Sequence, residues 1–129
     1  ETGACFVDLE TLLSRADFIS LHCPLTPETR HLLNADNLRR VKNGAYLINT
    51  ARGAVVDEQA LISALQSGRL AGAGLDVYEF EPHISGELLK MDQVILMPHV
   101  GSGTVETRAE MARLCARNII AVLEGQAAV

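Results

Sequence analysis

The stretch LAGAGLDVYEFEP, residues 70–82, joins an apolar segment to a group of acids. Its first part, residues 70–77, is apolar and too short for a solitary helix, which is typical of a buried strand. Asp76, Glu79 and Glu81 then follow one another closely. The stretch therefore predicts a strand whose carboxyl end carries polar side chains.

Three further runs have the same character and are also predicted to be strands. Each is short, rich in Ile, Val, Leu or Ala, and ends in polar residues. Their sequences are DFISLH (residues 17–22), AYLINT (45–50) and QVILMPH (93–99).

Helix signals separate the predicted strands, because residues that cap a helix precede apolar periodic segments and glycines follow several of them. The longest helix is expected from Thr104 to about Glu124. Its apolar stripe comprises Met111, Leu114, Cys115, Ile119 and Val122. The expected helix starts are Asp8, Thr26 with Pro27, Asn34, Asp57 and Thr104, and the expected ends are Gly44, Gly68 and Gly125.

Apolar strands separated by helices predict a parallel sheet with helices over both faces, because right-handed crossovers place helices there. We therefore expect a single α/β domain, a Rossmann-like doubly wound parallel sheet. In such sheets ligands bind beyond the carboxyl ends of the strands. The polar residues expected at that edge are His22, Thr50, Asp76 and His99.

Composition argues against several classes of function. The chain has 129 residues, 48% hydrophobic content and a formal net charge of −5, which fits a compact fold and gives nucleic acid little electrostatic reason to bind. No apolar run approaches the ~20 residues that cross a membrane, and residues 1–10 lack the features of a signal peptide. We therefore expect a cytoplasmic protein with no nucleic-acid or membrane partner.

The cysteines give no sign of a disulfide framework or a metal site. Cys5, Cys23 and Cys115 are odd in number and form no cluster along the sequence. We therefore expect buried free thiols and no bound metal.

Three residues near the predicted strand ends have side chains suited to catalysis. Arg52, in INTARG, presents a fork of donors that can bind a planar carboxylate, although a surface arginine in a turn fits this stretch equally well. His99, in MPHVGSG, can give and take a proton near neutral pH, although a lone histidine at a strand end is more often structural. A carboxylate at Glu81 beside His99 would favour and orient the protonated ring.

Other polar residues of this region are assigned structural or solvated roles. Glu79 is expected to be a solvated loop acid. Asp76 is suited either to accept hydrogen bonds from a ligand amide or to cap the following turn. His22, His31 and His83 are expected to be structural or exposed, with His31 on a helix.

Four motifs, in this order, resemble those of the D-isomer-specific 2-hydroxyacid dehydrogenases. The resemblance covers almost the whole chain and implies the second half of the cofactor domain of that family. The motifs are LHCPLTPETRHLL (residues 21–33), LINTARGAVVDEQAL (47–61), AGAGLDVYEFEP (71–82) and ILMPHVGSGT (95–104).

The resemblance implies an oxidoreductase that transfers a hydride between NAD or NADP and C2 of a small 2-keto or 2-hydroxy acid. It implies that Arg52 binds the substrate carboxylate, that His99 is the acid/base and that Glu81 is the partner of His99. It also implies that Asp76 faces the nicotinamide. The residues expected to line the dinucleotide are Cys23, Thr50, Ala51, Arg52, Asp76, His99, Val100, Gly101 and Ser102.

The chain departs from the family in two respects. It contains no G-x-G-x-x-G turn, which holds the pyrophosphate in the first strand–helix–strand unit, and no trace of a substrate-binding domain. We therefore expect residues 1–129 to be the C-terminal half of an NAD(P)-binding domain, with that first unit and the substrate domain absent. Alone, this half is expected to bind NADH weakly or not at all and to be inactive. It is also expected to self-associate through its open sheet edge and apolar face, or to persist only alongside the remainder of its parent chain. The expected partner is a second copy, in a homodimer.

Two other interpretations remain open at this point. One is a non-catalytic relative, similar to the corepressors that share this fold and sense a dinucleotide. The other is an unrelated doubly wound domain, which would make four ordered motifs a coincidence. Formate dehydrogenases of the same fold are disfavoured, since they carry glutamine at the position of Glu81.

Overall fold

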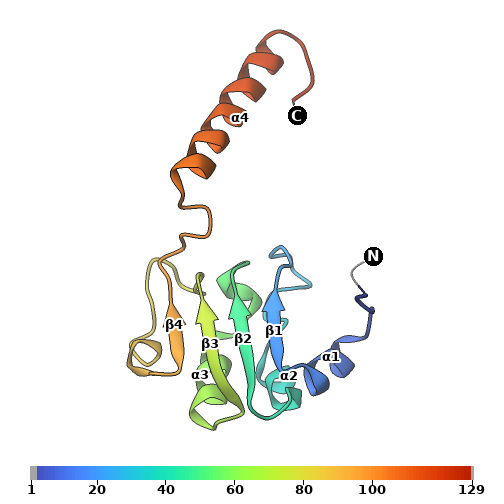
Figure 1. The fold of residues 1–129 in the computed structure, drawn as a ribbon, viewed down its shortest axis with the longest axis vertical. Helices are drawn as coiled ribbons and strands as arrows, with labels where there is room; N and C mark the ends of the chain where they lie inside the picture. Colours follow the sequence, from blue (N-terminus) through green and yellow to red (C-terminus); the bar gives the residue numbers. More distant parts are fainter. Residues whose placement is uncertain (1–2, 129) are drawn as a thin grey trace. The chain divides into compact units, whose positions relative to one another are not determined.

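The computed structural model describes residues 3–128. It separates into two compact units, Glu1–His99 and Val100–Val129. The described part of the first unit contains the sheet and most of the helices (Figure 1). Its elements are α1 (Leu9–Arg15), β1 (Phe18–Leu21), α2 (Ala35–Arg40), β2 (Ala45–Asn49), the 3-10 turn η1 (Gly53–Val55), α3 (Glu58–Gln66), β3 (Leu70–Leu75), the 3-10 turn η2 (Leu88–Lys90) and β4 (Val94–Leu96).

The predicted strands form one parallel sheet. Among the described residues it has four strands in the order β1-β2-β3-β4, and each strand pairs in parallel with its neighbour. The α/β class and the parallel sheet expected from the alternating sequence pattern are therefore confirmed.

Helices cover one face of the sheet in this unit. Buried and exposed positions alternate along β1, so that Ile19 and Leu21 face the core while Phe18 is exposed. On the exposed face Phe18 stacks on Tyr46 of β2, with 5.4 Å between ring centroids. The expectation of helices over both faces does not hold within residues 3–99, because the strands follow the period of two that one covered face requires.

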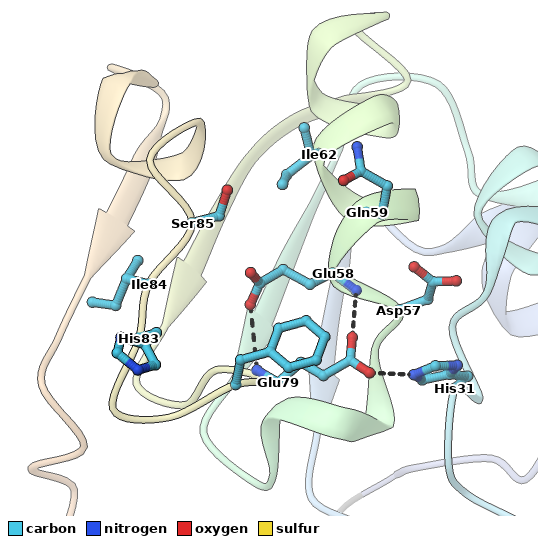
Figure 2. A pocket seen from close by; sticks show the side chains of 10 residues that line it. His31, Asp57, Glu58, Gln59, Ile62, Glu79, His83, Ile84 and Ser85 are labelled. Carbon is cyan, nitrogen blue, oxygen red and sulfur yellow. Dashed lines mark hydrogen bonds and ion pairs between the residues drawn. The ribbon is translucent and has the colours of Figure 1, made fainter.

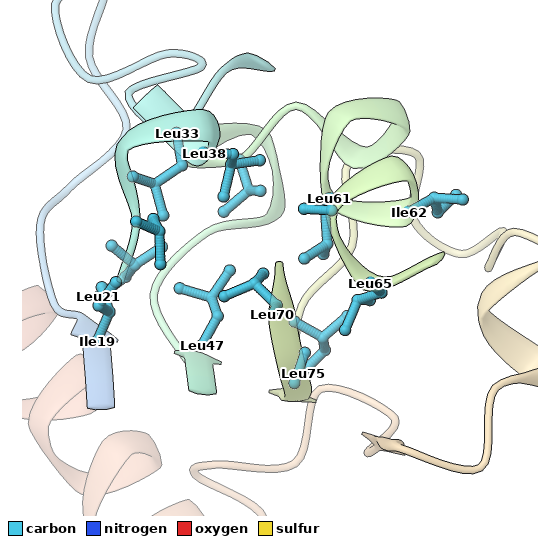
Figure 3. Packing of buried hydrophobic residues seen from close by; sticks show 14 of the residues in the cluster. Ile19, Leu21, Leu33, Leu38, Leu47, Leu61, Ile62, Leu65, Leu70 and Leu75 are labelled. Atoms are coloured by element: carbon cyan, nitrogen blue, oxygen red, sulfur yellow. The ribbon is translucent and has the colours of Figure 1, made fainter. Parts of the chain in front are cut away.

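The core lies between the sheet and helices α2 and α3. Figure 3 shows leucine and isoleucine side chains of the helices meeting those of the strands. Leu47 of β2 is fully buried, and Leu61 and Leu65 of α3 are almost so. Burying each such side chain contributes about 1.5–3 kcal/mol, so this layer holds the strand ends in fixed positions.

Most helix starts agree with the sequence analysis because capping is local. Asp8, Asn34 and Asp57 each accept a hydrogen bond from the backbone N–H three residues later, at 2.7, 3.0 and 3.0 Å. Gly68 follows α3 with φ of 73°, a left-handed conformation that glycine adopts without strain. Gly44 lies beyond the observed end of α2 at Arg40, and leads into β2 instead.

The helix predicted to start at Thr26 and Pro27 is absent from the described residues. A hydrogen-bonded turn takes its place, in which the Thr29 hydroxyl donates to the carbonyl of Pro24 at 2.7 Å and accepts from the Thr26 N–H at 2.8 Å. Side-chain bonds to the nearby backbone compete with a helix. His31, expected on that helix, instead has φ of 51°.

The second unit is dominated by one helix, α4 (Val105–Leu123), which Thr104 caps through the N–H of Thr107 at 3.1 Å. None of the described side chains of α4 is buried. Its predicted apolar stripe is therefore present as a pattern, with none of its side chains buried. No helix in residues 3–128 has the length and hydropathy needed to cross a membrane.

The expectation of buried thiols is wrong. Cys5 and Cys115 are exposed and Cys23 is half-buried. The sequence pattern could not reveal this, since a cysteine in an apolar stripe is buried only where another element covers the stripe.

Candidate active site

Parallel strands bring three of the predicted site residues to one edge of the sheet. Arg52 follows the end of β2, Asp76 directly follows β3, and His99 follows β4. Because the paired strands run in the same direction, their carboxyl ends meet at the same edge. Asp76 is 7% exposed, and its N–H donates to the carbonyl of Asn49 at 3.0 Å.

His99 and Glu81 form a hydrogen-bonded pair at this edge. The His99 Nδ1–H donates to Glu81 Oε2 at 2.8 Å, which is the contact expected from the sequence. The hydrogen bond from His99 lowers the pKa of the Glu81 carboxyl, and the N–H of Tyr78 adds to this effect. With Nδ1 committed to Glu81, Nε2 is the ring atom left to exchange a proton with a ligand.

The backbone at His99 is held in an unusual conformation. Its φ is 56°, in the left-handed region that residues other than glycine rarely adopt. Such a residue costs on the order of 1–3 kcal/mol and persists only where the surroundings fix it. The imidazole is therefore presented to solvent, 51% exposed, by a backbone that other contacts must hold in place.

Arg52 lies on a turn that Asn49 organises. The buried amide of Asn49 donates to the Arg52 carbonyl at 3.0 Å and accepts from the Ala51 N–H at 3.1 Å. The exposed guanidinium of Arg52 donates to the Ala51 carbonyl at 2.7 Å, so it folds back on its own turn in this structure.

Gly53 ties this turn to the loop that carries Glu81. A Cβ at Gly53 would lie 1.9 Å from the backbone carbon and oxygen of Tyr78 and 2.5 Å from the N of Glu79. Only a glycine allows so close an approach of two backbones. The position of Arg52 is thereby linked to that of Glu81.

A hollow of about 520 Å³ lies beyond the ends of β1 and β2. It contains four of the residues predicted to line the dinucleotide: Cys23, Thr50, Ala51 and Arg52. Its position and mixed polar and apolar lining fit a cofactor at the carboxyl edge of a parallel sheet. Val100, Gly101 and Ser102 belong to the second unit, where the Gly103 N–H donates to the Val100 carbonyl at 2.7 Å.

The interpretation of Glu79 as a solvated acid is wrong. Its side chain is 7% exposed, and Oε1 accepts from Nε2–H of His31 at 2.6 Å and from Arg30 Nη2 at 3.3 Å. Its other oxygen accepts from the N–H of Glu58 at 3.1 Å, while Glu58 Oε2 accepts from the N–H of Glu79 at 3.3 Å. Figure 2 shows these reciprocal bonds between α3 and the loop after β3.

The group of His31, Glu58 and Glu79 borders a second hollow, of about 450 Å³. Burial raises the pKa of the Glu58 carboxyl, and the nearby charge of Glu79 adds to that rise. The hydrogen bonds of these carboxylates join three segments of the fold, so we interpret the group as a brace. Within residues 3–128 no cluster of three or more His, Cys, Asp or Glu side chains could hold a metal ion.

The remaining histidines agree with the structural roles expected of them. The ring of His22 is hydrogen-bonded to the hydroxyl of Ser20 at 2.8 Å, and His83 is exposed in its loop. No role was predicted from the sequence for Asn49, Tyr78 or Glu58. A polar residue ending an apolar strand was the available signal for Asn49; for the other two, nothing local indicated long-range hydrogen bonds.

Comparison with known proteins identifies the family. The family described as D-isomer specific 2-hydroxyacid dehydrogenase, NAD binding domain, matches residues 1–101. The glyoxylate reductase of Thermococcus litoralis is 56% identical over 126 residues, which are 98% of this chain and 38% of that protein.

Solved structures agree with this match. A glyoxylate reductase from Paecilomyes thermophila has a TM-score of 0.93 and 42% identity, covering 97% of this chain and 38% of that one. A D-isomer specific 2-hydroxyacid dehydrogenase from Xanthobacter autotrophicus, in complex with NADPH and MES, has a TM-score of 0.81 and 42% identity, covering 94% of this chain and 50% of that one.

The chain thus spans half or less of the length of these relatives. The family match over most of the chain, the identity to a relative and the shared fold all agree. The chain belongs to the D-isomer specific 2-hydroxyacid dehydrogenases and corresponds to part of their NAD-binding domain.

Proposed function

We propose that this chain supplies the cofactor-side half of the active site of an NAD(P)-dependent enzyme that reduces small 2-keto acids, glyoxylate among them. The observation that carries the proposal is the 2.8 Å bond between His99 Nδ1 and Glu81 Oε2 at the carboxyl edge of the sheet. The names of the relatives support the choice of glyoxylate.

His99 acts as the acid in this proposal. Glu81 holds Nδ1 and stabilises the imidazolium, so that Nε2–H can deliver a proton to the oxygen of the substrate carbonyl. When bound, the reduced nicotinamide supplies the hydride that reaches C2. The products are a 2-hydroxy acid and the oxidised cofactor, and His99 is left neutral, ready to take a proton from solvent or from a 2-hydroxy acid in the reverse direction.

Arg52 binds the substrate carboxylate in this proposal. A guanidinium offers two parallel N–H donors and stays charged at any working pH. The bond of Arg52 to its own turn is to a neutral carbonyl, and a carboxylate would replace it with a stronger charge-assisted pair. The buried Asn49 amide keeps the turn in place while the side chain moves.

The cofactor occupies the hollow beside Cys23, Thr50 and Ala51 in this proposal, with Asp76 and His99 completing its surroundings. The half-buried Cys23 serves as a contact and not as a nucleophile. The position of the hollow beyond the ends of β1 and β2 supports this assignment.

A chimera tests the proposed function. In it, this chain replaces the matching 126 residues of the Thermococcus litoralis glyoxylate reductase. The chimera should reduce glyoxylate with NADH or NADPH. A folded chimera that binds cofactor without any turnover would favour a dinucleotide sensor and contradict the proposal.

Arg52→Lys in the chimera tests the carboxylate site. It should raise KM for glyoxylate by at least tenfold, since an ammonium cannot reproduce a two-pronged grip. Arg39→Lys, on the exposed surface of α2, is the matched control and should leave KM unchanged. An unchanged KM in Arg52→Lys would remove Arg52 from the substrate site.

We also propose that the chain pairs with a second copy in the cytoplasm. The exposed sheet face carries Phe18, Tyr46 and Ile95, which are 70%, 45% and 70% exposed. Apolar side chains on an open sheet favour association. Sedimentation of the 129-residue chain should show a dimer, and a monomer at high micromolar concentration would contradict this.

A further inference from the structure

Tyr78 is hydrogen-bonded to Glu81 and to the segment just before His99, although it is not a member of the His99–Glu81 pair. It lies in the loop after β3 and is 6% exposed. Its hydroxyl oxygen is 2.7 Å from the carbonyl oxygen of Met97 and 3.3 Å from that of Leu75. The single hydroxyl proton favours the shorter of these contacts, which fixes the backbone two residues before His99.

The backbone of the same residue fixes the other partner. The Tyr78 N–H donates to Glu81 Oε1 at 2.9 Å, while the second oxygen of Glu81 accepts from His99. One residue therefore holds the carboxylate through its N–H and the histidine-bearing segment through its hydroxyl. Burial also raises the pKa of the Tyr78 hydroxyl, so this group remains a donor throughout the neutral range.

We propose that Tyr78 is a positioning residue for the acid/base pair. Its hydroxyl binds Met97 and its N–H binds Glu81, so that the two members of the pair are held together. The left-handed φ of His99 makes such support necessary, because the backbone there does not keep this conformation on its own. The importance of the residue for turnover rests on the proposed function, but its effect on the geometry of the pair does not.

A role in packing alone is the alternative. Tyr78 belongs to the core cluster, and its ring would contribute to burial whether or not the hydroxyl mattered. Tyr78→Phe separates the two roles, since it keeps the ring and removes only the bond to Met97. Tyr46→Phe is the matched control, because Tyr46 is half-exposed on β2 and away from the pair.

NMR on the 129-residue chain tests the proposal directly. In the unchanged chain, ¹⁵N shifts should show neutral His99 mainly as the Nδ1–H tautomer, which the bond to Glu81 selects. In Tyr78→Phe the excess of that tautomer over the other should fall at least twofold, and the pKa of Glu81 should rise toward its ordinary value, because its bond from His99 weakens. Tyr46→Phe should change neither quantity.

An unchanged tautomer ratio and an unchanged Glu81 titration in Tyr78→Phe would overturn the proposal. Should that variant fold poorly, the hydroxyl proton of Tyr78 in the unchanged chain gives the answer: slow exchange with water supports the bond to Met97, and exchange as fast as that of Tyr46 contradicts it.

Turnover in the chimera distinguishes this inference from the proposed function. Tyr78→Phe should lower kcat about fivefold to tenfold with KM within twofold, as loss of one aligned hydrogen bond predicts. An inactive unmutated chimera would overturn the proposed function, while the NMR result would still decide the role of Tyr78.

Discussion

Glu79 and Glu81 stand two residues apart in one loop, and their carboxylates have opposite surroundings. Glu79 is 7% exposed and binds His31, Arg30 and the N–H of Glu58. Glu81 is 35% exposed and binds one side chain, the ring of His99, which is 51% exposed. One carboxylate holds segments of the fold together, and the other leaves its partner open to a ligand.

The difference shows how a structural acid can be told from a catalytic one. A carboxylate whose lone pairs are used by two other segments has no capacity left for chemistry, and moving it would disturb both. A carboxylate that orients one exposed imidazole can act on that ring without disturbing the core. Exposure and partner number, and not residue type, separate the two regions.

The largest effect is expected from a substitution that removes the partner of Glu81. In the chimera, His99→Ala should lower kcat by ~10²–10⁴ while the affinity for NADH stays within about threefold, because proton transfer is lost and the other cofactor contacts are kept. His83→Ala, in the exposed loop, is the control and should leave kcat unchanged. Equal losses of turnover and of cofactor binding would mean that His99 serves binding and not proton transfer.

A smaller effect, on stability, is expected from a substitution at Gly53, where the Arg52 turn meets the loop of Glu79 and Glu81. Gly53→Ala would place a Cβ 1.9 Å from the Tyr78 backbone, directly between the Arg52 turn and the loop of both acids. We expect a loss of unfolding free energy of about 3 kcal/mol, measured by urea denaturation, since backbone atoms must shift to relieve the overlap. Gly86→Ala, with open space around the added methyl group, is the control. Equal stability of the two variants would refute the close approach.

The smallest effect is a difference in pH dependence between the two regions. Burial raises the pKa of Glu58 above 4.5, so the folded state holds this proton more tightly than the unfolded state. Its contribution to stability is fully present below pH 4.5 and is lost as the pH rises through the folded pKa. Glu58→Gln should therefore lose less stability than the unchanged chain between pH 4 and pH 7, and Glu106→Gln on α4 should behave like the unchanged chain.

Glu81 should show the opposite sign. Its pKa is lowered in the folded chain, so its contribution to stability is present above 4.5 and is lost as the pH falls through the folded pKa. Urea denaturation of Glu81→Gln, carried below pH 4.5, should therefore show a weaker loss of stability toward acid than the unchanged chain shows. If Glu58→Gln and Glu81→Gln changed the slope of unfolding free energy against pH in the same direction, the division between the Glu58–Glu79 brace and the Glu81–His99 pair would be contradicted.

The parts of the fold that depend on short-range signals could be predicted from the sequence. The strand containing Leu47 follows from its apolar run, and the helix starts at Asp8 and Asp57 follow from side chains that cap the N–H three residues later. The edge that carries Arg52 and His99 follows from parallel pairing alone. The turn at Thr26 was missed because hydrogen bonds of the Thr29 hydroxyl to the nearby backbone take the place of a helix there.

The burial of Glu79 could not be predicted, because it depends on residues far away along the chain. Glu79 reaches His31, 48 positions earlier, and Glu58, 21 positions earlier. The pattern of two acids in EFEP is the same whichever of them the fold buries. The bond from the Tyr78 hydroxyl to Met97, 19 positions later, was unpredictable for the same reason.

The most direct test compares the kcat of Glu81→Gln with that of Glu79→Gln in the chimera, with the unfolding free energy of each measured beside it. Glu81→Gln should lower kcat by about 10² and leave stability within about 0.5 kcal/mol, since it weakens only an exposed pair. Glu79→Gln should lower stability by about 1–3 kcal/mol and leave kcat within threefold at temperatures where the protein is folded. Similar kcat values for the two variants would contradict the account.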